Sequence, residues 1–184
     1  MIKAIIFDYF GVISSDEYWQ MVKVDKNMTS DWLNMANRVN LGKLHWLDFM
    51  KTVAERTGKS FEEVERIYAQ EKINPGVVAL AQELKSQYKI GLITNAHHEF
   101  LEPILENTKL NDIFNTIVIS SRVGYIKPDK RIFELALQEL EIEPKEAVFI
   151  DDIERNVTAA QAMGLNGIFY KDLAQLRHEL AGFL

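Results

Sequence analysis

The stretch Lys3-Ala4-Ile5-Ile6-Phe7-Asp8-Tyr9-Phe10-Gly11-Val12 sets the fold of this chain, because a short apolar run ends abruptly at an acid. Short apolar runs rich in β-branched residues or Phe are typical of strands that are buried on both faces. Four further runs of this kind follow along the 184 residues. The predicted strands are Lys3–Phe7, Ile90–Ile93, Thr116–Ile119, Ala147–Ile150 and Gly167–Tyr170.

Segments with helical periodicity separate the later runs. In one of them, Phe133, Ala136, Leu137 and Leu140 fall on one face of a helix. The predicted helices are Val77–Gln87, Glu99–Asn107, Lys130–Leu140 and Arg155–Met163. This alternation predicts the α/β class, with a Rossmann-like parallel sheet covered by helices on both faces. In such sheets the functional site lies beyond the carboxyl ends of the strands.

Residues 14–74 interrupt the alternation with a polar, helical pattern. We therefore expect a Rossmann-like core formed by residues 1–13 and 75–184, with residues 14–74 inserted as a small all-helical cap. Ser60 followed by Glu63 is typical of a capping box that opens a helix. The apolar anchors expected inside the cap are Trp19, Met21, Trp32, Leu33, Trp46, Phe49, Met50, Val53, Phe61, Val64 and Ile67.

Composition narrows the possible functions. Apolar residues make up 47% and charged residues 26%, which is ordinary for a globular domain. The net charge of −6 disfavours nucleic acid and anionic membranes as partners. The chain has no cysteine, so thiolate chemistry and zinc–thiolate sites are excluded. Asp8 also cuts the first apolar run too short for a signal peptide, so a cytoplasmic location is expected.

Polar residues follow four of the predicted strands, in the order Asp8, Thr94-Asn95, Lys127 and Asp151-Asp152. Three converging carboxylates would repel one another and raise one another's pKa values unless a cation joined them. Mg²⁺ suits a site of a few carboxylates with water and phosphate oxygens. A carboxylate at the end of the first strand can also attack phosphorus. Thr94, Asn95 and Lys127 would then stabilise the transferring group.

Four ordered motifs resemble those of the haloacid dehalogenase superfamily, in its branch with a helical cap after the first strand. They are Ile5-Ile6-Phe7-Asp8-Tyr9-Phe10-Gly11-Val12, Ile93-Thr94-Asn95, Lys127-Pro128-Asp129 and Phe149-Ile150-Asp151-Asp152. The resemblance implies that Asp8 is the nucleophile, that Thr94 binds the phosphoryl group and that Lys127 steadies both. It also implies Mg²⁺ binding by Asp8, the Phe10 backbone carbonyl and Asp152, with Asp151 as a ligand or as support through water.

Phe10 departs from the pattern of the family's phosphatases, which usually place a second Asp there to protonate the leaving group. The family's dehalogenases resemble this chain more closely at Phe10, but they are metal-free and lack a paired acid in the fourth motif. Asp151-Asp152, with Asn156 after it, resembles phosphatases near the sugar-phosphate phosphatases and the N-terminal domain of epoxide hydrolases. We interpret the Phe10 ring as a packed aromatic, and Asn156 as either support for the site or a surface residue.

The favoured prediction is a Mg²⁺-dependent phosphatase that forms an aspartyl-phosphate on Asp8 and acts on a small phosphorylated molecule, such as a sugar phosphate. One alternative is a metal-independent hydrolase of carbon–halogen bonds that uses the same Asp8. A second is a non-catalytic binding or regulatory protein that has lost turnover with its acid–base residue. His97-His98 are expected to begin a helix near the cap rather than to bind metal. No pattern in the sequence indicates an oligomeric state.

Overall fold

The computed structural model describes residues 1–14, 30–68 and 72–184, and this part of the chain contains a parallel sheet of five strands. The strands lie in the order β3-β2-β1-β4-β5, and Ile5 in the central strand pairs with Ile90 on one side and Val148 on the other. The predicted α/β class is confirmed. The strand bounds are β1 Ala4–Phe7, β2 Lys89–Thr94, β3 Thr116–Ile119, β4 Ala147–Asp151 and β5 Asn166–Phe169.

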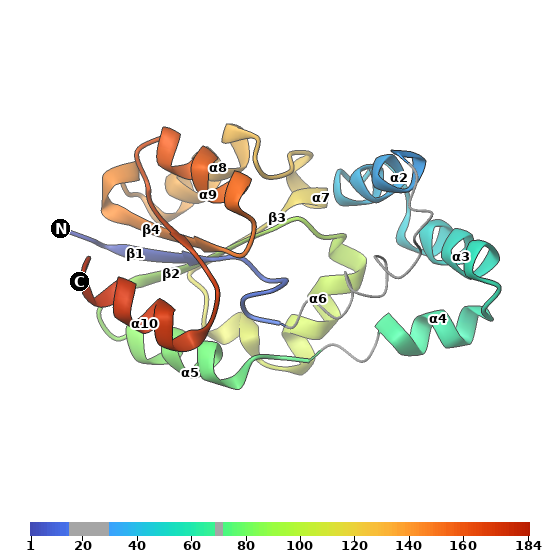
Figure 1. Ribbon diagram of the computed structural model, residues 1–184, viewed down its shortest axis with the longest axis horizontal. Coiled ribbons are helices and arrows are strands. Elements are labelled where there is room, and N and C mark those ends of the chain that lie inside the picture. The colour runs from blue at the N-terminus through green and yellow to red at the C-terminus, as the bar shows by residue number, and fades with distance from the viewer. Residues whose placement is uncertain (15–29, 69–71) are drawn as a thin grey trace.

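Helices cover both faces of the sheet (Figure 1). One face carries α5 (Pro75–Leu84), α6 (His98–Asn107) and α10 (Leu173–Ala181). The other face carries α8 (Lys130–Leu140) and α9 (Glu154–Ala162). A short helix, α7 (Ser120–Val123), follows β3, and 3₁₀ turns occupy Leu110–Asp112 and Pro144–Glu146. Of these, α10 and α7 were not predicted from the sequence.

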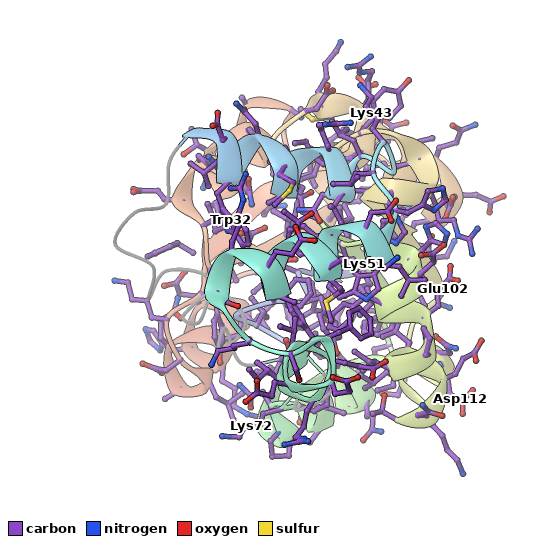
Figure 2. The ribbon with its side chains drawn as sticks, turned by 90° about the vertical axis from the view of Figure 1, so that its right-hand side faces the viewer. Trp32, Lys43, Lys51, Lys72, Glu102 and Asp112 are labelled. Carbon is purple, nitrogen blue, oxygen red and sulfur yellow. The ribbon has the colours of Figure 1, made fainter. Side chains whose placement is uncertain are left out.

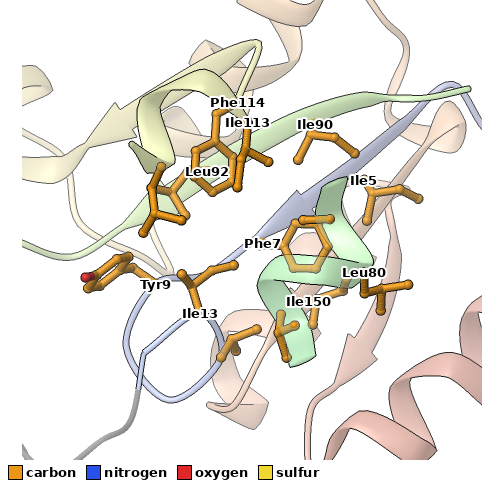
Figure 3. Packing of buried hydrophobic residues seen from close by; sticks show 14 of the residues in the cluster. Ile5, Phe7, Tyr9, Ile13, Leu80, Ile90, Leu92, Ile113, Phe114 and Ile150 are labelled. Carbon is orange, nitrogen blue, oxygen red and sulfur yellow. The ribbon is translucent and has the colours of Figure 1, made fainter. Parts of the chain in front are cut away.

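The central strand contributes to both cores because successive side chains of a strand point to opposite faces. Ile5 and Phe7 pack toward α5, together with Leu80, Ile90 and Ile150 (Figure 3). Ala4 and Ile6 pack toward α8 and α9 on the opposite face. All four β1 residues are fully buried. The central strand is therefore buried up to Phe7, the residue that precedes Asp8.

Side-chain caps define where several helices begin. Asn74 accepts a hydrogen bond from Val77 N at the start of α5, where Pro75 occupies the first turn. Asp129 accepts one from Arg131 N at the start of α8. In the insert, Ser60 and Glu63 exchange backbone-to-side-chain hydrogen bonds of 2.9 and 3.2 Å, so the predicted capping box is confirmed.

The insert between β1 and α5 lies beside the carboxyl ends of the strands (Figure 1). Its described helices are α2 (Ser30–Asn40), α3 (Trp46–Thr57) and α4 (Phe61–Tyr68). They share a small apolar cluster that includes Trp32, Phe49, Met50, Val53 and Val64. The boundary at 14–74 stays a prediction.

Leu33 corrects the expected set of cap anchors. Leu33 is 54% exposed, because the face of α2 that meets the cluster is the one carrying Trp32, Met35 and Val39. Trp19 and Met21 lie outside the described residues.

Candidate active site

Asp8, Lys127 and Asp151 form a buried ion-pair bridge at the carboxyl ends of β1 and β4. The ammonium nitrogen of Lys127 lies 2.6 Å from Asp8 Oδ1 and 2.7 Å from Asp151 Oδ2. All three side chains are almost completely withdrawn from solvent. Charged groups are rarely buried without partners, so this bridge is a built feature of the fold.

The bridge changes the pKa values of its members. Burial raises the pKa of Asp8 well above its usual value of 3.8, and the neighbouring Asp151 carboxylate raises it further, although Lys127 partly opposes both. Burial alone would lower the pKa of Lys127, but the Asp151 and Asp8 carboxylates outweigh it and raise that pKa. The ammonium therefore stays charged, and Asp8 carries an electrostatic cost that a further cation would relieve.

Asp151 is held on both of its oxygens. Oδ1 accepts from Ile153 N at 2.8 Å, Oδ2 accepts from Lys127, and the side-chain amide of Asn156 donates to both oxygens at 3.1 and 3.0 Å. Asn156 is itself buried, so the surface position, one of the two interpretations left open from the sequence, is wrong, and its role in the site stays a prediction. With its lone pairs engaged in this way, Asp151 orients Lys127.

Asp152 completes a group of three carboxylates. One oxygen each from Asp8, Asp151 and Asp152 lie within 4.8 Å of one another, close enough to hold a metal ion. Three carboxylates and one ammonium carry a formal charge of −2, which one divalent cation would neutralise. Asp152 is only partly buried, so it forms the solvent-facing side of the group. Oxygen ligands of this kind suit Mg²⁺.

Thr94 ends β2 and Asn95 directly follows it, but the two side chains have different surroundings. Thr94 is fully buried, and within the described residues its hydroxyl oxygen has no hydrogen-bond partner. Asn95 accepts from Lys127 N at 2.7 Å and donates to Lys127 O at 3.1 Å. Asn95 thus fixes the backbone that carries the ammonium, a contact the sequence did not reveal. The substrate-binding role of both residues stays a prediction.

Phe10 connects the site to the insert. Its ring lies edge-on to Tyr9 at 5.0 Å and stacks on Phe100 of α6 at 6.3 Å. The ring centroids of Phe100 and of Trp46 in α3 are in turn 4.8 Å apart. The expected packed aromatic is confirmed, because Phe10 is 7% exposed. The side chain that departs from the phosphatase pattern therefore joins the core to the cap.

His97 and His98 start α6, as predicted. His97 is buried, and its Nδ1 accepts a hydrogen bond from Glu99 N at 3.3 Å. Burial, followed by the charge of His98, lowers the pKa of His97, so its imidazole is neutral at pH 7. The His97 ring also lies 6.4 Å from the Trp46 ring of the cap. Among the described residues, only Asp8, Asp151 and Asp152 form a group of three or more acidic or histidine side chains close enough to hold a metal ion, and it contains no histidine.

The fold and these side chains define a class: an α/β protein whose carboxylates gather at the carboxyl ends of a parallel sheet, next to a helical insert. The chain belongs to the haloacid dehalogenase-like hydrolase family, whose profile matches residues 2–164. The family suggested by the four motifs is thereby confirmed.

The chain is also similar to curated proteins, at about 30% identity. Pyrimidine 5'-nucleotidase YjjG of Escherichia coli K12 is 28% identical over 75% of this chain and 62% of its own length. Pyrophosphatase PpaX of Bacillus thuringiensis (strain Al Hakam) is 33% identical over 48% of this chain and 41% of its own length. The chain thus spans only about two fifths to three fifths of these relatives.

Solved structures share the fold at low identity. A family enzyme from Bacteroides thetaiotaomicron, in complex with magnesium and inorganic phosphate, has a TM-score of 0.76 at 22% identity and covers 93% of this chain and 95% of its own. An L-2-haloacid dehalogenase from Xanthobacter autotrophicus with covalently bound chloropropionic acid has a TM-score of 0.69 at 18% identity, covering 99% and 83%. This fold is therefore shared by a protein crystallised with inorganic phosphate and by one crystallised with covalently bound chloropropionic acid. None of the helices in the described part of the chain has the length and hydropathy needed to span a bilayer.

Proposed function

We propose that this protein is a Mg²⁺-dependent phosphatase that hydrolyses a small phosphate monoester through a phosphoryl group carried on Asp8. The observation that carries the proposal is the buried bridge in which Lys127 contacts Asp8 and Asp151, with Asp152 completing a carboxylate group of metal-binding size. A metal-free attack on carbon has no use for the charge of Asp152. The magnesium–phosphate complex of the Bacteroides thetaiotaomicron enzyme supports the same choice.

The residues present fit a magnesium ion. Asp8, Asp152 and the Phe10 backbone carbonyl would hold it, and Asp151 would support it through water. Bound there, Mg²⁺ would neutralise charge on the phosphoryl oxygens. The close approach of the Gly11 backbone to Asp152 supports this ligand set, because it holds the Asp152 carboxylate against the loop that presents the Phe10 carbonyl.

Asp8 performs both chemical half-reactions. Its Oδ1 accepts hydrogen bonds from Lys127 Nζ and Tyr9 N, both at 2.6 Å, so we assign the attack on phosphorus to Oδ2. A bond forms between Oδ2 and phosphorus, and the bond from phosphorus to the leaving oxygen breaks. Water then attacks the same phosphorus, the bond between phosphorus and Oδ2 breaks, and phosphate leaves with the Asp8 carboxylate restored. Thr94 Oγ1, Asn95 and Lys127 would bind the phosphoryl oxygens.

The leaving oxygen needs a proton that Phe10 cannot supply. Water in the site would have to supply it. Good leaving groups are therefore expected to react fastest, because loss of a positioned acid lowers rates by roughly 10²–10⁴.

A chelation assay tests the proposal. Aryl phosphates incubated with the protein and Mg²⁺ should release phosphate, and EDTA should abolish that release. Asp152→Ala should lose both the activity and the rise in melting temperature that Mg²⁺ produces by binding the native state. Glu154→Ala, an exposed acid in the first turn of α9, is the matched control. Halide release from haloacids that persists in EDTA would establish the carbon–halogen alternative, which the apolar Phe10 favours.

A further inference from the structure

Two serines directly after β3 hold the loop that follows β2. Ser120 Oγ accepts a hydrogen bond from Ala96 N at 3.0 Å, and Ser121 N donates one to Ala96 O at 3.3 Å. The same loop begins with Asn95, directly after Thr94 at the end of β2. The two serines therefore fix the backbone beside the side chains that are expected to bind the phosphoryl group.

The Ser120 hydroxyl also contacts the insert. It donates a hydrogen bond of 2.6 Å to the backbone oxygen of Asn40, the last residue of α2. A hydroxyl has a single proton, and the alternative acceptor, Ala96 O, is more distant at 3.2 Å. Ser120 is fully buried, so bulk water does not compete for these bonds. One core side chain thus joins the end of α2 to the loop after β2.

The turn after α2 lies against the same part of the core. Gly42 has a φ of +69°, and a Cβ added there would lie 2.6 Å from Ser121 O, a backbone atom that cannot turn aside. The helices α2 and α7 are accordingly neighbours (Figure 1). Seen from the insert side, Trp32 marks the beginning of α2 and Lys43 the turn beyond its other end (Figure 2). The α2–α7 junction comprises Asn40, Gly42, Ser120 and Ser121.

A second contact between the insert and this loop is less directional. The rings of Trp46 and His97 stack with their centroids 6.4 Å apart. A hydrogen bond depends on both distance and angle, whereas stacked rings can slide over one another. The Ser120 hydroxyl therefore restrains the loop relative to the insert more closely than the ring contact does.

We propose that Ser120 is a positioning residue that makes the placement of Thr94 and Asn95 depend on the docking of α2 at the α2–α7 junction. The inference rests on the proposed function for the role of Thr94 and Asn95. Donors that stabilise a transferring phosphoryl group must be aligned before the reaction begins. Loss of the Ser120 hydroxyl would release Ala96 N and Asn40 O together, so neither the loop nor the end of α2 would be held.

Ser120→Ala tests the positioning role, with p-nitrophenyl phosphate and Mg²⁺ as the assay. We expect kcat to fall about tenfold, because a displacement of about 1 Å in an active site can lower rates by on the order of 10²-fold. KM should change by less than about threefold, since donors aimed at the transferring group act mainly on the transition state. Asn40→Ala keeps the backbone oxygen that Ser120 contacts, so this control should retain the wild-type kcat. A wild-type kcat in Ser120→Ala would overturn the proposal.

A double-mutant cycle separates positioning from a general loss of stability. Gly42→Ala disturbs the junction from the insert side, so it should lower kcat in the wild-type background and add little to Ser120→Ala. Gly58→Ala is the matched control, because Gly58 has a φ of +67° in the same insert and nothing within 4 Å of its added Cβ. It should lower the melting temperature without changing kcat. Independent, multiplying effects of Gly42→Ala and Ser120→Ala, or equal kcat losses in the two glycine variants, would contradict the coupling.

Amide hydrogen exchange without substrate separates the junction from the proposed turnover. Ser120→Ala should speed exchange both in the loop after β2 and in α2, because both lose a hydrogen bond to the same hydroxyl. Ser121→Ala, which loses the bond from His98 N to Oγ, should speed exchange beside His98 but not in α2. Unchanged exchange in α2 of Ser120→Ala would refute the junction. The expected exchange pattern in a protein that hydrolyses no phosphate ester would refute the phosphatase and retain the coupling between insert and loop.

Discussion

A Cβ atom placed on Gly11 would lie 2.3 Å from Asp152 Oδ2, so this backbone position and this carboxylate can be neighbours only while residue 11 is glycine. Gly11 also has a φ of +81°, a conformation that L side chains rarely adopt. The loop that follows the nucleophile and the acid that follows β4 are thus mutually dependent.

Gly11→Ala should therefore displace Asp152 and weaken Mg²⁺ binding. We expect a loss of roughly 1–2 kcal/mol in the free energy of unfolding from the backbone conformation alone. The Mg²⁺-dependent shift in melting temperature should decrease as well, which a thermal titration measures. Gly58→Ala is the control, because Gly58 has a φ of +67° and nothing within 4 Å of its added Cβ. An unchanged magnesium shift in Gly11→Ala would contradict the close approach.

Asp8→Asn should abolish hydrolysis without unfolding the protein. The folded pKa of Asp8 is raised above its unfolded value, so folding takes up a proton between those two values. The stability contributed by protonated Asp8 is complete below the unfolded pKa and is lost as the pH rises through the folded one. At pH 7 without metal, Asp8→Asn should therefore be as stable as the wild type or more so. Urea unfolding in EDTA from pH 3 to 8 should show a flatter profile for the variant.

Lys127→Met should be far more harmful to the fold than Asp8→Asn. It leaves the buried Asp8 and Asp151 carboxylates facing each other without the ammonium, and breaking a buried pair costs roughly 3–5 kcal/mol. Mg²⁺ should recover part of that loss by binding the uncompensated carboxylates. Denaturant unfolding with and without Mg²⁺ measures both effects. Lys145→Met is the control, because Lys145 is an exposed lysine outside the insert. It should change the free energy of unfolding by less than about 0.5 kcal/mol.

Phe10→Asp should restore a carboxyl where the family's phosphatases usually have one. The rate for aryl phosphates divided by the rate for alkyl phosphates should then decrease by roughly tenfold or more, since a positioned acid assists the poorer leaving group most. Removal of the ring that stacks on Phe100 should destabilise the protein by roughly 3–5 kcal/mol, so rates must be compared on folded protein.

Phe10→Leu separates the two effects, because it removes the ring stack without adding an acid. Its aryl-to-alkyl ratio should match that of the wild type. If the wild type already hydrolyses both classes equally, another group supplies the proton, and His97 is the next residue to test.

Much of the fold could be predicted from local sequence patterns. The four β1 residues are buried because a continuous apolar run can lie only inside a covered parallel sheet, and that pattern was sufficient to predict the strand. The helix α10 escaped prediction because its core contacts depend on only a few leucines, Leu176 and Leu180 among them, which is too short a repeat to show a period. Leu33 was assigned to the cap core because its apolar character alone does not reveal the direction of its side chain.

The sequence by itself determined that Asp8, Thr94, Lys127 and the Asp151-Asp152 pair gather at one edge of the sheet, because the carboxyl ends of parallel strands share that edge. Only the tertiary structure decided which of these residues contact one another and which other residues hold them in place. Asn95 holds the backbone of Lys127, 32 residues along the chain, and Lys127 contacts Asp151, 24 residues further on. Hydrogen bonds and charge interactions act over a few ångströms in space, and distances of that kind between remote residues are set by packing rather than by spacing along the chain.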